Sequence, residues 1–143
     1  MSTILVIDDN RSQREAMVRV LARAGHRVTT AADGVEGVRA YRQHPPDLVV
    51  VDMLMPEKEG VATILDIRAT HPDARVLAIS GGGLFVAEDV LRIARLLGAD
   101  ETLQKPFKSH ALIAAVTRCL SAETQRADLA AGFIPGAQPT TPR

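Results

Sequence analysis

The sequence predicts an α/β fold: a three-layer, doubly wound (βα)5 sandwich around a central five-stranded parallel sheet. Two observations predict it. Short runs rich in Val, Ile and Leu occur at Thr3–Ile7, Asp47–Val51 and Arg75–Ile79, and such continuous apolar runs are typical of strands buried on both faces of a parallel sheet. Helical patterns separate these runs, and this alternation favours right-handed βαβ units.

The first helix and the strand after it follow from local signals. In Arg14–Ala24 apolar side chains recur at three- and four-residue spacing, and Gly25 ends the pattern. Asn10 is a suitable N-cap, and Gln13 is placed to complete a capping box with it. The half-polar segment His26–Ala31 is predicted to be an edge strand.

The remaining elements continue the alternation. They are predicted as helices over Gly34–His44, Glu57–Thr70, Ala87–Leu97 and Phe107–Leu120, and a short strand over Asp100–Leu103. Pro45 and Pro46 stop the first of these helices. From about Ala122 the periodicity is lost, so we expect one domain over residues 1–121 and a flexible tail over 122–143.

The composition is that of an ordinary globular domain, with 46% hydrophobic and 24% charged residues. The 17 basic and 17 acidic residues cancel, which argues against electrostatic binding to nucleic acid or anionic lipid. The N-terminus has a strand pattern rather than a basic leader, and no apolar run approaches the roughly 20 residues of a membrane span. The single cysteine, Cys119, cannot form an internal disulfide, so we expect a cytoplasmic protein.

Polar side chains follow the predicted strands at their carboxyl ends: Asp8 and Asp9, then Asp52, Ser80 and Lys105. Because the carboxyl ends of parallel strands share one edge of a sheet, we expect these residues to converge. Crowded carboxylates repel one another, a divalent cation removes that repulsion, and all-oxygen ligands favour Mg²⁺. A metal-bound carboxylate can attack phosphorus, while Lys105 neutralises the phosphoryl oxygens and Ser80 donates a hydrogen bond to one of them.

Five sequence motifs lie on these elements in a fixed order. They are IDD at 7–9, VVVDMLMP at 49–56, Gly60, ISG at 79–81 and KPF at 105–107. Each motif alone is weakly specific, but together they closely resemble the receiver domains of two-component response regulators over roughly residues 3–121. The resemblance implies a flavodoxin-like strand order, 2-1-3-4-5, and a Lys105–Pro106 bond that is often cis.

The resemblance also implies a role for each site residue. Asp52 would be the phosphoacceptor, and Ser80 and Lys105 would hold the phosphoryl group. Asp9 would bind Mg²⁺ directly and Asp8 mainly through a metal-bound water, with Asp52 and the backbone carbonyl of Leu54 as the other protein ligands.

The implied function is a signalling switch that catalyses only its own phosphoryl transfer and dephosphorylation. A sensor histidine kinase or a histidine phosphotransfer protein would supply the phosphoryl group. Because no DNA-binding segment is recognisable, output would run through phosphate relay or through protein contact over residues 87–120. The sequence is compatible with a homodimer, and equally with a fragment of a longer hybrid kinase or regulator.

Three other functions place different requirements on the sequence. A P-loop NTPase requires GxxxxGK[ST] upstream of Asp52, and the sequence lacks it. Haloacid-dehalogenase-like phosphatases need a second acid two residues after the nucleophile, where this chain has Leu54. The rival that stays open is a receiver-like interaction module that works without phosphorylation.

Two segments depart from the family pattern. Thr102 stands where the family usually has an aromatic ring that turns inward on activation, so we expect a different conformational readout. Gly81–Phe85 is unusually rich in glycine, and is either simply flexible or becomes ordered when Ser80 engages the phosphoryl group. Neither Leu54 nor Gly82 can orient an attacking water, which predicts slow self-dephosphorylation.

Overall fold

The computed structural model describes residues 2–53, 60–81, 92 and 95–130 of the 143-residue chain. Its elements, in chain order, are β1 (Thr3–Ile7), α1 (Arg11–Arg23), β2 (Arg27–Ala31), α2 (Gly34–Gln43), β3 (Leu48–Asp52), α3 (Gly60–Thr70), β4 (Val76–Ser80), β5 (Glu101–Gln104) and α5 (Ser109–Ala130). Strands and helices alternate from β1 to β4 and again from β5 to α5, as the sequence predicts, while most of the connection between β4 and β5 lies outside the described residues.

The five strands form one parallel sheet in the order β2-β1-β3-β4-β5, which confirms the predicted fold and strand order. β2 lies at one edge, and three of its five residues are exposed, as its half-polar sequence predicts. β3 and β4 are buried along their whole length, in agreement with their continuous apolar runs.

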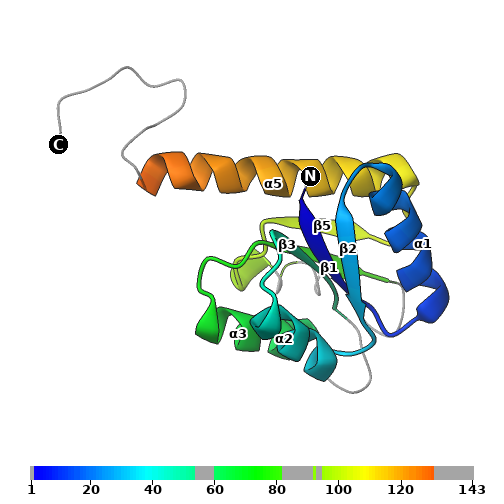
Figure 1. The fold of residues 1–143 in the computed structure, drawn as a ribbon, viewed down its shortest axis with the longest axis horizontal. Coiled ribbons are helices and arrows are strands. Elements are labelled where there is room, and N and C mark those ends of the chain that lie inside the picture. The colour runs from blue at the N-terminus through cyan, green and yellow to red at the C-terminus, as the bar shows by residue number, and fades with distance from the viewer. Residues whose placement is uncertain (1, 54–59, 82–91, 93–94, 131–143) are drawn as a thin grey trace.

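Helices cover both faces of the sheet (Figure 1), and two apolar clusters fill the space between the sheet and these two helical layers. Alternate residues of each central strand point to opposite faces, so neighbours in β3 such as Val49 and Val50 belong to different clusters. Val38 and Ile64 bring α2 and α3 onto one face, and Leu21 and Leu112 bring α1 and α5 onto the other. The result is the predicted three-layer sandwich.

Local signals fix the ends of the first helix. The Asn10 side chain accepts a hydrogen bond from the backbone N–H of Gln13, as expected of an N-cap. After the helix, Gly25 adopts a φ of 96°, a left-handed conformation that glycine reaches without a Cβ penalty. Both predicted boundaries of α1 are therefore confirmed to within a few residues.

The largest difference from the sequence-based expectation is the length of α5. The helix was expected to end near Leu120, but it continues to Ala130 and runs past the body of the domain (Figure 1). Residues 122–130 contain Ala, Glu, Gln, Arg and Leu, which are good helix formers, so propensity sustains the helix where the apolar pattern has ended. The predicted end of the helix at Leu120 is therefore wrong, whereas the flexible tail predicted over 122–143 stays a prediction, and residues 131–143 lie outside the described residues.

Other boundaries move by only a few residues. β5 covers Glu101–Gln104 rather than Asp100–Leu103, and α3 is described from Gly60. Of the predicted helix Ala87–Leu97, the structure describes helical main chain at residues 92, 95 and 96, and the rest lies outside the described residues. Within the described part of the chain, no helix is both long and apolar enough to cross a bilayer.

Candidate functional site

Three carboxylates meet at the carboxyl edge of the sheet. Asp8 and Asp9 follow β1, and Asp52 is the last residue of β3. One carboxylate oxygen from each lies within 4.8 Å of the others. Asp8 is fully buried, Asp52 is 6% exposed and Asp9 is exposed, so the cluster faces solvent through Asp9.

The sheet register explains why these acids meet. β1 and β3 are neighbours, and Ile7 is paired with Val51. The next residue in each strand is therefore Asp8 or Asp52, which places the two side by side. No local feature of the sequence reports this pairing, because the two acids belong to separate βα units.

Ser80 and Lys105 reach the same edge from the neighbouring strands. Asp52 is paired with Ile79 of β4, so Ser80 follows one position beyond it, and the Ser80 side chain is fully buried. The Ser80 hydroxyl donates to the carbonyl of Gly81 at 3.4 Å. The backbone N–H of Lys105 donates to the carbonyl of Ser80 at 2.7 Å, which ties the segment after β5 to β4.

The ammonium of Lys105 lies among the acids. Its Nζ donates to Asp8 Oδ2 at 3.2 Å and lies 3.6 Å from Asp52 Oδ2. With 16% of its side chain exposed, Lys105 is shielded from much of the solvent screening that weakens surface ion pairs. The structure therefore brings together at one sheet edge all five residues that the sequence predicted for the site. The Lys105–Pro106 bond is cis.

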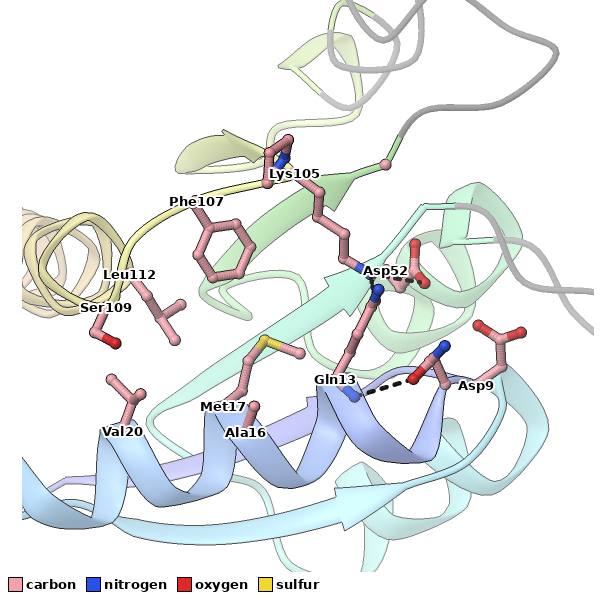
Figure 2. Close-up of a pocket in the computed structure, with 13 residues that line it drawn as sticks. Asp9, Gln13, Ala16, Met17, Val20, Asp52, Lys105, Phe107, Ser109 and Leu112 are labelled. Atoms are coloured by element: carbon pink, nitrogen blue, oxygen red, sulfur yellow. Dashed lines mark hydrogen bonds and ion pairs between the residues drawn. The ribbon is translucent and has the colours of Figure 1, made fainter.

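Gln13 does not complete the predicted capping box with Asn10. The backbone N–H of Asn10, its expected capping-box partner, donates instead to Asp8 Oδ1 at 2.9 Å. The Gln13 side chain extends from α1 toward Lys105, and its Oε1 accepts a hydrogen bond from Lys105 Nζ (Figure 2). Gln13 follows Asp8 and Asp9 by about one helical turn, and this spacing is the only sequence signal that its side chain could reach the site.

The site opens into a pocket of about 560 Å³ between the start of α1 and the start of α5 (Figure 2). Asp9, Asp52 and Lys105 line one end of it, and Met17 and Phe107 belong to its apolar end. A reactant that approaches Asp52 through this pocket would meet charged groups beside the acid and an apolar wall farther away.

Three further features concern the aromatic position in β5, the segments outside the described residues and the cysteine of α5. Thr102 Oγ1 accepts a hydrogen bond from Arg95 Nη2 at 3.2 Å, so the hydroxyl at the usual aromatic position links β5 to the preceding helical segment. Leu54 and residues 82–85 lie outside the described residues, so the roles predicted for Leu54, Gly82 and the glycine-rich segment stay predictions. Cys119 is a buried thiol, and burial raises its pKa to about 12, with Asp100 and Glu101 adding to the effect.

Comparison with known proteins identifies the family. The sequence model of the response regulator receiver domain family matches residues 4–117 of this chain. The chain belongs to this family. Its receiver segment is 38% identical over 112 residues to the response regulator MprA of Mycobacterium sp. (strain KMS), covering 78% of this chain and 47% of MprA. It is 34% identical over 130 residues to the DNA-binding transcriptional regulator NtrC of Azospirillum brasilense, covering 91% of this chain and 26% of NtrC.

Solved receiver domains have the same architecture. The receiver domain of NtrX from Brucella abortus superposes with a TM-score of 0.77 at 32% identity, covering 82% of this chain and 98% of that domain. A receiver domain protein from Clostridium thermocellum gives a TM-score of 0.80 at 28% identity, covering 87% and 98%. The chain thus matches isolated receiver domains almost end to end, while it spans less than half the length of the two curated regulators.

Proposed function

We propose that this receiver domain is a phosphorylation-controlled switch that accepts a phosphoryl group on Asp52 with the help of Mg²⁺. The observation that carries the proposal is the meeting of Asp52 with two further carboxylates and the Lys105 ammonium at one edge of the sheet. The domain is regulatory, and the reactions it catalyses are its own phosphoryl transfer and dephosphorylation.

The donor set fits a magnesium ion. Asp8, Asp9 and Asp52 offer oxygen ligands alone, within 4.8 Å of one another, and the exposed Asp9 leaves room for water. Mg²⁺ prefers oxygen donors and keeps several water ligands, so a partial protein site suits it. When bound, the ion supplies positive charge that offsets the repulsion between the acids and the incoming phosphoryl oxygens. The carbonyl of Leu54 is proposed as a further ligand.

The proposed reaction is a phosphoryl transfer from a phosphohistidine of a sensor kinase or phosphotransfer protein. A carboxylate oxygen of Asp52 forms a bond to phosphorus, the P–N bond of the donor breaks, and the imidazole leaves with its electron pair and is protonated from solvent. Lys105 then binds one phosphoryl oxygen. The Ser80 hydroxyl gives up its 3.4 Å hydrogen bond to the Gly81 carbonyl and donates to a second phosphoryl oxygen instead. The product is an aspartyl phosphate on Asp52.

The proposed output is contact with a downstream protein through the region 87–120, or onward relay of the phosphoryl group. The absence of nucleic-acid binding stays a prediction for this chain. It does not extend to longer proteins with a receiver segment, because the Azospirillum relative is named a DNA-binding transcriptional regulator. Cytoplasmic location and a homodimeric form are likewise proposals.

The experiment that tests the proposal uses acetyl phosphate, Mg²⁺ and intact-mass measurement. The native chain should gain the mass of one phosphoryl group, and Asp52→Ala should gain none. Asp73→Ala, which removes an exposed turn carboxylate, should behave as the native chain does. Uptake by Asp52→Ala would place the phosphoryl group elsewhere.

A second function, an interaction module that works without phosphorylation, is favoured by one observation. Thr102 already engages Arg95 through its hydroxyl, so β5 and the neighbouring helical segment are linked without an inward-turning ring. Absence of phosphoryl uptake by the native chain, together with absence of Mg²⁺ binding by calorimetric titration, would favour this second function.

A further inference from the structure

The Lys105 ammonium is held by two side chains from different elements. Nζ donates to Asp8 after β1 and to Gln13 on α1. Its 3.6 Å separation from Asp52 Oδ2 is longer than a normal hydrogen bond. An ammonium carries three N–H donors; among the described residues, Asp8 and Gln13 accept from two of them, and the third is available to an acceptor beside Asp52.

The position of Gln13 is itself fixed by the start of α1. Its backbone N–H donates to Asn10 Oδ1 at 3.0 Å, and the backbone N–H of Asn10 donates to Asp8 Oδ1 at 2.9 Å. Asp8 therefore takes over the capping contact that Gln13 would otherwise make. This frees the Gln13 amide to extend toward Lys105 (Figure 2), and Asp8 also helps to hold the main chain from which Gln13 extends.

We propose that Gln13 is a positioning residue for phosphoryl transfer. Together with Asp8 it fixes Lys105 Nζ so that one ammonium proton points to the place that a phosphoryl oxygen on Asp52 would take. This inference rests on the proposed function. At 3.6 Å the contact with Asp52 is longer than a direct hydrogen bond, so the third N–H of Nζ can turn to a phosphoryl oxygen without first breaking one.

The chemistry of an amide suits this task. Gln13 accepts a hydrogen bond without adding a fourth negative charge beside three carboxylates, so it does not repel an anionic phosphodonor. Without it, Nζ would move closer to Asp52 and turn the 3.6 Å ion pair into a direct hydrogen bond. That hydrogen bond would stabilise the ground state of the nucleophile and would have to be broken during transfer, so the barrier would rise.

Gln13→Leu tests the proposal because it removes the acceptor and keeps the side chain close in size. With acetyl phosphate and saturating Mg²⁺, we expect the initial rate of phosphorylation to fall roughly three- to tenfold. The Mg²⁺ affinity, measured by calorimetry, should stay within about twofold because Gln13 is not a proposed ligand. Gln43→Leu makes the same change at an exposed site at the end of α2 and should alter neither value.

Nitrogen-15 NMR of the lysine ammonium groups supplies a readout that does not depend on activity. The chain has three lysines, Lys58, Lys105 and Lys108, so the signals can be assigned by single Lys→Arg substitutions. Gln13→Leu should shift the Lys105 signal and speed its proton exchange with water. Gln13→Glu, which keeps an acceptor, should restore slow exchange, and Gln43→Leu should leave the Lys105 signal unchanged.

The possible failures are distinguishable. A native chain that takes up no phosphoryl group overturns the proposed function, and the role of Gln13 with it. A native chain that is phosphorylated no faster than Gln13→Leu overturns the role of Gln13 alone. An unchanged Lys105 signal in Gln13→Leu would show that the contact does not hold the ammonium in solution, and would also overturn that role.

Discussion

Arg75 and Asp100 form a buried ion pair at the opposite end of the sheet from the acidic site. Arg75 immediately precedes β4 and Asp100 immediately precedes β5, so the pair lies at the amino ends of these strands. Arg75 Nη1 lies 2.8 Å from Asp100 Oδ1, with side chains 2% and 3% exposed. Asp100 Oδ2 also accepts a hydrogen bond from the backbone N–H of Val76 at 2.9 Å, so one carboxylate joins both strands.

Asp100→Ala should lower the free energy of unfolding by about 3–5 kcal/mol, because it leaves the Arg75 charge buried without its partner. Urea unfolding measures the change. Glu15→Ala, which breaks the exposed Arg11–Glu15 pair, should leave the free energy of unfolding nearly unchanged. The double variant Arg75→Met, Asp100→Leu should recover much of the loss, because no charge then stays buried. Similar costs for Asp100→Ala and Glu15→Ala would contradict the argument.

At the scale of elements, Gly60 shows how closely α3 approaches the strand that carries the phosphoacceptor. A Cβ at this first residue of α3 would lie 2.6 Å from Met53 Cα and 2.8 Å from the carbonyl oxygen of Asp52. Both are backbone atoms, so neither can move without displacing the end of β3. Gly37 of α2 is also crowded, but a Cβ there would meet the side chain of Ile7, which can change rotamer.

Gly60→Ala should therefore disturb the site, and Gly37→Ala should act on stability alone. Overpacking typically costs about 1–3 kcal/mol, and we expect both variants to lower the free energy of unfolding by about that amount. Only Gly60→Ala should also weaken Mg²⁺ binding, by several-fold, because its clash moves the main chain of Asp52. Calorimetric titration of both variants at a temperature where they stay folded checks this. Equal Mg²⁺ affinities would show that α3 moves instead of the strand.

The same elements show what the sequence could predict. β1, β3 and β4 were predicted almost to the residue, because burial on both faces leaves a continuous apolar run that no other element of that length shares. The end of α5 at Ala130 was not predicted, because the last residues of this helix depend on helix propensity and lie beyond the apolar pattern. The partner of Gln13 was missed because it lies 92 residues away in the chain, while capping rules consider only neighbours.

At the scale of the whole molecule, the site stores electrostatic repulsion in the folded state. Three carboxylates lie together at the sheet edge, and the Lys105 ammonium neutralises only part of their charge. Unfolding separates these groups, so without a cation their repulsion favours the unfolded chain. A cation that binds only the folded arrangement reverses the balance, by about 2.7 kcal/mol when its concentration is 100 times its dissociation constant.

Removing one acid should then have opposite effects with and without Mg²⁺. Asp9→Asn, at the exposed member of the cluster, should make the metal-free domain equally or more stable, because repulsion falls. In Mg²⁺ it should be the less stable of the two proteins, because most of the gain from binding is lost. Thermal unfolding in EDTA and in MgCl₂ measures this crossing, with NaCl of equal ionic strength as the salt control and Asp73→Asn as the matched exposed acid. Parallel curves for native protein and Asp9→Asn in both conditions would mean that the acids do not bind Mg²⁺ as a unit. A crossing that Asp73→Asn lacks would tie the stability of the whole fold to the charge balance at Asp8, Asp9 and Asp52.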